Sequence, residues 1–476
     1  MINGQFQTSF SADSGSFRDP SSTLYKYNDG EIRIIRGIDE CTYNSIDKFL
    51  KSDLYKDLCD KEKIVATKIL DDTNFFNNQN NKNWYAYLEH KKIDFISYPY
   101  EWSFSQLKDA AILHLETLKE LLENGYIIKD SSAFNIQFKK NKPIFIDIPS
   151  IINWDDGMGW DSYRQFCMLF LYPLMLNSHL DIDYRDLLKS NLDGVEPSFM
   201  FKVFGYRNIL KKGALSHIIL PHIIEKNILK NERDTSKAKN RSNIKHSKIS
   251  VIAIVDSMLS LVSKLHSKNQ ISAWADYDHK NTYEDEDNAT KYKFIGDICK
   301  KNTFNNVWDM GANTGLFSEH ISPYVGNIIS MDGDAIAVER MYKRLQDKSS
   351  NINPIVMDIH NMSPNHGFNS KERTKLESRA NPDLVMCLAV IHHIRISANI
   401  PCDNFLSYLR SLNSKVIIEF VCREDEMVIK LLTNKNEKYI DYNIETFEKS
   451  VKNFFVIKNS VELKNGKRVL FFLEPI

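Results

Sequence analysis

The sequence of 476 residues contains few cysteines, and none of them is spaced for a disulfide framework or a metal. They are scattered along the chain, at Cys41, Cys59, Cys167, Cys299, Cys387, Cys402 and Cys422. Their number is odd, and neither a Cys-x-x-Cys pair nor a cysteine–histidine cluster occurs. We therefore predict no metal site and expect a reducing compartment in which the thiols stay free.

The sequence also lacks a secretory leader, a membrane span and an excess of either charge. Residues 1–17 are polar, without the basic-then-apolar order of a signal peptide, and no apolar run is long enough to cross a bilayer. Lysine plus arginine equal aspartate plus glutamate, at 62 each, so no net field draws the chain to nucleic acid. We expect a soluble cytoplasmic protein without a nucleic-acid partner.

A chain of this length needs more than one hydrophobic core. The stretch 226–250 is polar, basic and poor in apolar residues, which predicts a linker. A nucleic-acid-binding arm is the alternative, but no aromatic residues interleave its charges. The linker separates an N-terminal α+β domain, residues 1–225, from a C-terminal α/β domain, residues 251–476, whose leading helices include one predicted at 250–266.

Strands and helices alternate along the C-terminal domain. Five predicted strands are separated by helical patterns, and two more close the chain without a helix between them. This order predicts a Rossmann-like, mainly parallel seven-stranded sheet ending in a hairpin. The strands are expected at 307–310, 327–332, 354–358, 384–388, 415–421, 455–463 and 468–474.

The first of these strands ends in a glycine turn that opens a helix, in the sequence Asp-Met-Gly-Ala-Asn-Thr-Gly. Gly311 lets a ligand lie against the backbone, with Ala312 and Asn313 in the turn, and Gly315 lets the helix start pack closely. NAD sites favour G-x-G-x-x-G. Here Asp309 precedes the first glycine, where it can face the methionine end of a ligand, which favours S-adenosylmethionine as cofactor.

Carboxylates at the next two strand ends support that cofactor. Asp332 is the first candidate and Asp334 the second for hydrogen bonds to both ribose hydroxyls. Asp358 is the candidate for the adenine amino group. A single aspartate after a strand is an ordinary turn residue, but three at successive strand ends indicate one site.

The fourth strand opens toward the same crevice and ends in Cys387 and Leu388, which we expect beside the cofactor. His392 or His393 is a candidate base that would accept a proton from the methyl acceptor. Alternatively both histidines are structural, since holding the nucleophile in line supplies most of the catalysis. We interpret Cys387 as a small packing residue in preference to a nucleophile.

The N-terminal half carries a different pattern. Asp130, Asn135 and Asp147 have the spacing of a kinase-type phosphotransfer loop and its magnesium ligands, and residues 65–68 are similar to the strand that bears a kinase lysine. No glycine-rich nucleotide loop is visible, however. The sequence thus favours a kinase-like fold with a degenerate binding role, while polar turns in a βαβ-type domain remain the alternative.

Across nearly its whole length the chain resembles bacterial two-part methyltransferases related to the nodulation protein NoeA, within the class I S-adenosylmethionine-dependent methyltransferases. The resemblance implies methyl transfer. It also implies that the Trp-x-x-Tyr segment covers the cofactor, with Tyr277, Tyr283 and Lys291 near the site; a packed helix with solvated charges is the alternative. The motifs carrying it lie at 17–21, 96–103, 274–277, 308–315, 387–393 and 418–421.

We therefore expect a methyltransferase that transfers the methyl group to an oxygen or nitrogen of an acceptor that the sequence does not identify. The size of the N-terminal half, together with the resemblance, favours a glycan or glycolipid. A kinase-like phosphotransferase with a regulatory S-adenosylmethionine-binding domain is the first alternative. A non-catalytic sensor of the cofactor and an oxidoreductase are the others.

Overall fold

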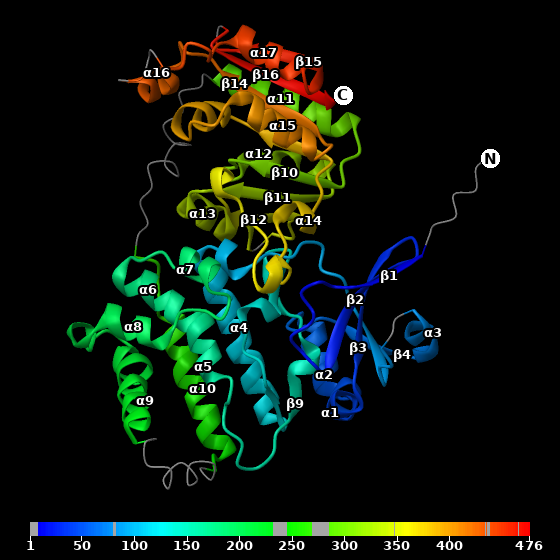
Figure 1. Cartoon of the computed structure of the whole chain (residues 1–476), viewed down its shortest axis with the longest axis vertical. Coiled ribbons are helices and arrows are strands. Elements are labelled where there is room, and N and C mark those ends of the chain that lie inside the picture. The colour runs from blue at the N-terminus through cyan, green and yellow to red at the C-terminus, as the bar shows by residue number, and fades with distance from the viewer. Residues whose placement is uncertain are drawn as a thin grey trace. The chain divides into compact units, whose positions relative to one another are not determined.

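The computed structural model describes residues 8–79, 82–231, 245–268, 285–346, 348–433, 435, 438–464 and 466–476. The chain forms two compact units, coloured along the sequence in Figure 1. Unit 1 comprises Met1–Asn269 and Gly367–Arg373, and unit 2 comprises Gln270–His366 and Thr374–Ile476. Within the described residues, no helix combines the length and apolar character needed to cross a bilayer. Much of the predicted linker, 232–244, lies outside the described residues.

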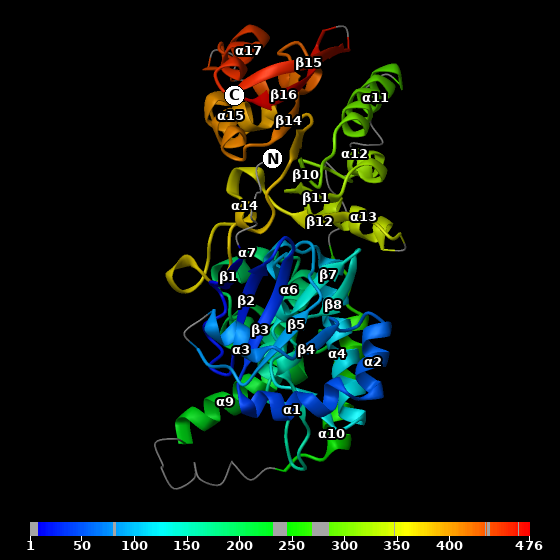
Figure 2. The same ribbon diagram turned by 90° about the vertical axis from the view of Figure 1, so that its right-hand side faces the viewer.

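Unit 1 begins with an antiparallel five-stranded sheet in the order β1-β2-β3-β5-β4, seen in Figure 2. Two helices, α1 (Glu40–Leu50) and α2 (Asp53–Asp60), lie between β3 and β4 in the chain. Each begins at a polar cap, since Asp39 and Ser52 accept hydrogen bonds from the backbone N–H groups of the first turns. The strands are β1 (Ser9–Ala12), β2 (Ser22–Asn28), β3 (Ile32–Ile38), β4 (Thr67–Leu70) and β5 (Ala86–His90).

A long buried helix, α4 (Phe104–Glu123), forms the centre of the rest of unit 1. It begins at a capping box of Ser103 and Gln106 and ends before Gly125, whose φ of +84° suits glycine. Two strand pairs follow: β6 (Tyr126–Ile128) pairs with β9 (Ile151–Asn153), and β7 (Ile136–Lys139) with β8 (Lys142–Phe145). The remaining helices include α3 (Thr73–Asn78), α5 (Tyr163–Phe166), α6 (Tyr172–Leu180), α7 (Arg185–Ser190), α8 (Pro197–Phe204) and α9 (Leu220–Asn231).

Helix α10 (Lys248–Ser263) is the helix that the sequence analysis assigned to the second domain, and the structure groups it with unit 1 instead. It packs against α4, where the Lys108 ammonium donates to two carbonyl oxygens at its end, of Ser263 and Leu265, both at 2.8 Å. Its apolar residues Val255 and Met258 are fully buried. Burying this face explains why the helix belongs to the first core.

Unit 2 contains a seven-stranded sheet in the order β12-β11-β10-β13-β14-β16-β15 (Figure 1). The first five strands in this order are parallel, while β16 is antiparallel to both of its neighbours. This confirms the predicted Rossmann-like, mainly parallel sheet with a terminal hairpin. The strands are β10 (Asn306–Met310), β11 (Asn327–Asp332), β12 (Ile352–Val356), β13 (Leu384–Cys387), β14 (Lys415–Val421), β15 (Phe455–Leu463) and β16 (Arg468–Pro475).

Helices pack on this sheet through a buried apolar layer. Val307, Ile328 and Met386 of three strands share one core cluster with Ile295 of α11 and Met341 of α13. Burial of this layer leaves the carboxyl ends of the parallel strands free to carry polar groups. The helices are α11 (Asp285–Lys301), α12 (Leu316–Ile321), α13 (Ala335–Leu345), α14 (Leu376–Arg379), α15 (Cys402–Ser411), α16 (Glu426–Leu432) and α17 (Ile444–Lys452).

Candidate functional site

The glycine turn after β10 is fixed by hydrogen bonds to β11. The backbone N–H groups of Gly311 and Ala312 both donate to the Met331 carbonyl oxygen, at 2.9 and 3.0 Å. Gly311, Asn313 and Gly315 all have positive φ, of +78°, +50° and +81°. Strain at the non-glycine Asn313 is the kind that accumulates at ligand-binding turns.

Each of the two glycines lies in close contact with a neighbouring side chain. A Cβ on Gly311 would lie 2.5 Å from a methyl group of Val390, so the space that the missing side chain leaves is taken by the loop after β13. A Cβ on Gly315 would lie 2.6 Å from the sulfur of Met341 in α13, so the turn packs closely against that helix.

Asp332 at the end of β11 is joined directly to the turn. One carboxylate oxygen accepts the N–H of Asn313 at 2.7 Å, and the other accepts the N–H of Asp334 at 2.7 Å. Burial raises the pKa of Asp332, while these two hydrogen bonds oppose the rise. A carboxylate has about four acceptor positions, so Asp332 keeps capacity for two ribose hydroxyls while its place beside the turn is fixed.

The other two strand-end carboxylates lie close to Asp332. The charges of Asp334 and Asp358 both act on its carboxyl group. Asp334 caps α13 by accepting the N–H of Ile336 at 2.9 Å, which gives it a structural use. Asp358 follows β12 and pairs with His360 at 3.0 Å, and its side chain is more than half exposed. Asp358 is thus open to a ligand.

Asp309, in contrast, is buried beneath the turn. Its carboxylate accepts the Ser318 hydroxyl of α12 at 2.7 Å, and Ser318 in turn contacts Ser330. Burial, the largest cause, raises the pKa of Asp309 to about 6; the charge of Asp332 also raises it and that of Lys291 lowers it. The turn thus brings together the predicted residues Asp309, Asn313 and Asp332.

The end of β13 is apolar and buried, and the loop after it contains a residue with positive φ. Cys387 is fully buried, and its thiol lies 3.9 Å from the sulfur of Met310. Burial raises the pKa of this thiol well above its usual range, so it is a packing residue. Leu388 belongs to the core cluster shared by α11 and the strands. Ala389, which the sequence analysis did not single out, has φ of +53°.

The two histidines lie side by side after β13, with ring centroids 4.2 Å apart. Burial, with smaller contributions from nearby charges, lowers the pKa of His392 to about 3 and that of His393 to about 4. Both rings are therefore neutral at pH 7. In the described part of the chain, the buried Nδ1 atom of His392 has no hydrogen-bond partner, so it can meet a group that a ligand brings.

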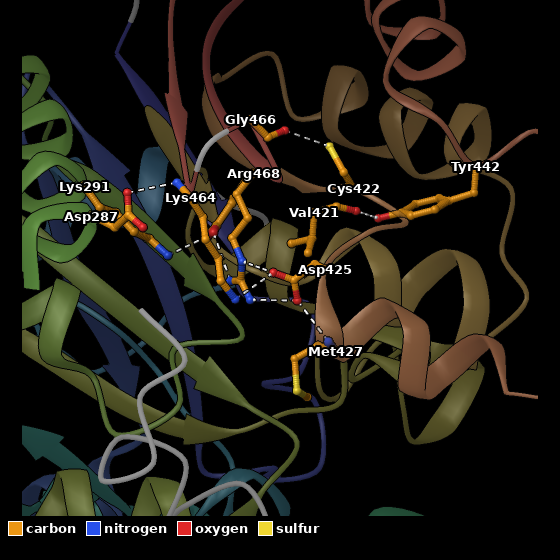
Figure 3. Close-up of polar contacts among 11 residues, drawn as sticks. Asp287, Lys291, Val421, Cys422, Asp425, Met427, Tyr442, Lys464, Gly466 and Arg468 are labelled. Carbon is orange, nitrogen blue, oxygen red and sulfur yellow. Dashed lines mark hydrogen bonds and ion pairs between the residues drawn. The ribbon is translucent and has the colours of Figure 1, made fainter. Parts of the chain in front are cut away.

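A buried ionic network, which the sequence analysis missed, lies at the end of β14 (Figure 3). The Lys291 ammonium of α11 contacts Glu419 at 2.5 Å, and Arg468 at the start of β16 contacts the same carboxylate at 3.3 Å. Arg468 also donates to Asp425, at 2.8 and 3.2 Å. The sequence signal that could have revealed this network is Glu419, a charged residue between apolar residues of a predicted buried strand. The charges of Arg468, Glu419 and Asp425 act on His392.

The kinase-type residues of unit 1 also lie near one another. The Asn135 amide donates to the Asp130 carbonyl oxygen at 3.3 Å, and the charge of Asp130 acts on Asp147. Asp147 forms an ion pair with Arg36 of β3 at 3.0 Å, while burial raises its pKa. Lys68, in the segment similar to a kinase strand, lies on β4 and pairs with Glu89. The last two residues of the segment 65–68 thus lie on β4, whereas the ion-pair partner of Asp147 lies on β3.

A segment distant in sequence completes unit 1 beside these residues. Glu372 accepts two hydrogen bonds from Arg18, at 2.7 and 2.9 Å, and the Arg373 guanidinium lies 4.2 Å from the ring centroid of Phe134. Tyr277 and Tyr283 of the expected cover lie outside the described residues. Within the described ranges, no three His, Cys, Asp or Glu side chains are grouped to hold a metal.

Comparison with known proteins gives one relative that spans nearly the whole chain. The chain is 30% identical over 463 residues to nodulation protein NoeA from Rhizobium meliloti (strain 1021), covering 97% of this chain and 95% of NoeA. No family model matches the chain.

Solved structures match parts of the chain. N-methyltransferase NodS from Bradyrhizobium japonicum WM9 matches 40% of this chain and 99% of its own, at 12% identity and a TM-score of 0.30. Its complex with S-adenosyl-L-homocysteine matches 42% and 91%, at 12% identity and a TM-score of 0.30. WbdD matches 45% and 46%, at 16% identity and a TM-score of 0.29. TM-scores this low carry no argument about function.

Proposed function

The chain belongs to the family of the nodulation protein NoeA, and on this premise we propose that it is an S-adenosylmethionine-dependent methyltransferase. The observation that carries the proposal is the position of Asp332. Its carboxylate is held by the N–H of Asn313 in the glycine turn and is within electrostatic reach of Asp309 and Asp358. Acidic groups from three strand ends around one glycine turn suit a cofactor with a ribose, an adenine amino group and a cationic methionine end.

Each residue then has a role that follows from its surroundings. Asp332 accepts the ribose hydroxyls, Asp358 the adenine amino group, and Asp309 provides negative charge at the methionine end. Asp334 caps α13, while Cys387 and Leu388 supply apolar packing at the end of β13. When bound, the cofactor supplies a methyl group on a sulfonium, which an oxygen or nitrogen nucleophile displaces.

The histidines limit how the reaction is catalysed. With pKa values of about 3 and 4, His392 and His393 are unprotonated at neutral pH, so either ring can accept a proton or hydrogen bond. Bases this weak accept little proton charge, however. The main contribution of the chain is then the placement of the acceptor in line with the methyl group.

A matched pair of variants tests the cofactor site. Asp332→Ala is expected to weaken binding of S-adenosylhomocysteine by tenfold to hundredfold, on the order of the loss of a charged hydrogen-bond acceptor. Asp383→Ala is the control, since Asp383 also accepts two backbone N–H groups, at 2.6 and 3.0 Å, but at the opposite, amino end of the strands. Calorimetric titration measures both. Equal losses in the two variants would contradict the proposal, as would a wild-type chain that does not bind.

The acceptor proposal is broader. We infer that unit 1 recognises an acceptor with an oxygen or nitrogen nucleophile, of glycan or glycolipid type, because it is large and separate from the cofactor residues. Incubating the full chain with methyl-labelled cofactor and panels of glycans, small metabolites and nucleic acids tests this. Label found only in small metabolites or only in nucleic acid would overturn it.

A second candidate function concerns unit 1. Its five-stranded antiparallel sheet, the helices after its third strand, and the loop that brings Asp130, Asn135 and Asp147 together support a kinase-like architecture. Asp147, one of the proposed magnesium ligands, is already paired with Arg36. This supports a role in ligand binding over phosphotransfer. ATP turnover that Asp147→Ala abolishes and Gly311→Arg leaves unchanged would instead establish the phosphotransferase candidate.

A further inference from the structure

Helix α8 of unit 1 and the turn that follows it expose apolar side chains to solvent. Tyr206 in this turn is 62% exposed and Leu210 is 96% exposed. Phe201 of α8 contacts Tyr206 and stacks on His222 of α9, with ring centroids 5.3 and 3.8 Å apart. The helix α8, the turn and the start of α9 therefore form one continuous surface (Figure 1). Exposed apolar side chains that gather in this way mark an interaction site.

The start of α9 extends this surface as an apolar stripe. The backbone N–H of Leu220 donates to the Leu215 carbonyl oxygen in a π-helical turn, which places residues five apart on the same side. Ile224 follows Leu220 by one further turn of α-helix. These three side chains are about half exposed, whereas Ile218 and Ile219 of the same π-helical turn are buried. The helix thus turns one apolar side toward unit 1 and a second one toward solvent.

The charged residues that alternate with these apolar ones are all positive. The sequence between residues 197 and 224 contains no aspartate or glutamate, and its exposed basic residues are Lys202, Arg207, Lys211 and Lys212. Within the described ranges, none of these basic side chains forms an ion pair. The bias is local, because acidic and basic residues are equal in number over the whole chain. The surface therefore combines exposed apolar groups with positive charge that no acid of the chain neutralises.

Two lysines from different segments lie close together at this surface. Lys264 follows α10 directly, and the turn before α9 packs on the same helix, since a Cβ on Gly213 would lie 2.6 Å from Leu261. Partial desolvation, and then the charge of Lys264, lower the pKa of Lys212. Two neighbouring ammonium groups repel each other, and a phosphate group bound to both relieves that repulsion.

We propose that residues 199–224 form a membrane-docking surface, on which the basic side chains contact lipid phosphates and the aliphatic side chains enter the headgroup region of an anionic bilayer. Exposed apolar residues interleaved with lysine and arginine are typical of segments that lie in a membrane interface. Tyr206, with an apolar ring and a polar tip, suits the boundary between water and lipid.

The charge distribution favours a bilayer over a protein partner. Protein surfaces carry both signs of charge, whereas the membrane-docking surface carries one sign only and matches a surface of uniform negative charge. The inference goes beyond the proposed function, because docking requires no cofactor. It also agrees with an acceptor of the glycolipid type, which docking would bring close to unit 1.

The test is sedimentation of the full chain with vesicles of phosphatidylcholine alone, or of phosphatidylcholine mixed with phosphatidylglycerol. The wild type is expected to bind the mixed vesicles at low salt, to bind the neutral ones weakly, and to be released as salt rises. The double variant Lys211→Gln, Lys212→Gln should lower the partition coefficient on mixed vesicles by roughly twentyfold to thirtyfold, about fivefold for each charge. Leu210→Ser should lower it by roughly tenfold. Because Leu210 is 96% exposed, its replacement leaves the folded core intact.

Two matched controls remove the same chemistry from other places. Lys91→Gln with Lys92→Gln removes another pair of adjacent exposed lysines of unit 1, and Ile440→Ser removes an aliphatic side chain of unit 2 that is 75% exposed. Both controls should bind the mixed vesicles as the wild type does.

The inference is overturned if the wild type does not bind the mixed vesicles at low salt. It is also overturned if the variants of the membrane-docking surface bind as tightly as the wild type, or if the controls lose as much as they do. Gel filtration tests the rival occupant, since dimers that Leu210→Ser dissociates, in a chain that does not bind vesicles, would assign the surface to a second copy. A wild type that binds vesicles but not S-adenosylhomocysteine supports this inference and removes the proposed function alone.

Discussion

Asp309 has the most informative titration in the candidate site. The residue is 2% exposed, and burial is the main reason that the pKa of its carboxyl group rises from 3.8 to about 6. A group whose folded-state pKa is raised binds more protons in the folded chain, so its contribution to stability falls as pH rises from about 4 through 6. A shift of about two units corresponds to about 3 kcal/mol at neutral pH.

Asp309→Asn should therefore stabilise the protein at pH 8 by up to about 3 kcal/mol and have little effect near pH 4. The asparagine side chain keeps an oxygen that can accept the Ser318 hydroxyl. Urea unfolding of both proteins between pH 4 and 8 measures the difference. A difference in unfolding free energy that stays constant between pH 4 and 8 would contradict the raised pKa of Asp309.

The two histidines make stability depend on pH in the direction opposite to Asp309. The effect of Asp309 must therefore be measured as the difference between Asp309→Asn and the wild type at each pH. His392 and His393 have lowered pKa values, of about 3 and 4. The unfolded chain then binds more protons than the folded chain below about pH 6.5, and their contribution to stability is lost as pH falls. The free energy of unfolding of the wild type therefore depends on pH through both the histidines and Asp309. Both proteins contain the histidines, so the difference between Asp309→Asn and the wild type reports Asp309 alone.

At the scale of elements, β14 and β16 are joined by charges as well as by their ladder. Arg468 is 1% exposed and contacts Glu419 and Asp425, which are both fully buried. Removing one member of such a network leaves buried charge without a partner, which typically costs about 3 to 5 kcal/mol. The contacts of Arg468 with Glu419 and Asp425 therefore fix the end of β14, where the loop to α16 begins.

Arg468→Met is expected to lower the free energy of unfolding by about 3 to 5 kcal/mol. Lys343→Met is the control, because the exposed Lys343 pairs with Glu339 one turn away in α13, and such a pair within a helix is worth about 0.5 kcal/mol or less. Denaturant titration of both variants gives the two values. Similar small losses would mean that the buried network adds nothing to stability.

The sequence predicted the elements better than their long-range partners. The glycine turn and Asp332 could be found because strand ends and turns are local patterns, and the parallel sheet brings them together. The pairing of Lys291 with Glu419, 128 residues later, has no local signal. The same holds for the pairing of Arg36 with Asp147.

Helix α10 illustrates the same limit for a whole element. Its apolar spacing predicted a helix, and α10 at Lys248–Ser263 agrees with that. The spacing does not say which core covers the apolar face, however. Its proximity in sequence to the second domain suggested the wrong neighbour, because the face is buried against α4, more than a hundred residues earlier.

The whole molecule comprises two compact units, each large enough to unfold cooperatively. Leu118 of α4 and Ile328 of β11 are fully buried, one in each unit. Truncating either to alanine should cost about 2 to 5 kcal/mol. We expect two transitions in differential scanning calorimetry, with Leu118→Ala lowering one and Ile328→Ala the other.

S-adenosylhomocysteine should then raise only the transition that Ile328→Ala lowers. At a ligand concentration of about 100 times the dissociation constant, the stabilisation is about 2.7 kcal/mol, or a rise of roughly 5 to 10 °C for a unit of about 200 residues. ATP with magnesium, added separately, should raise the other transition if the residues Asp130, Asn135 and Asp147 form a nucleotide site. A single transition that both variants and the ligand move together would contradict the division of the chain, because one cooperative unit responds as a whole wherever it is perturbed.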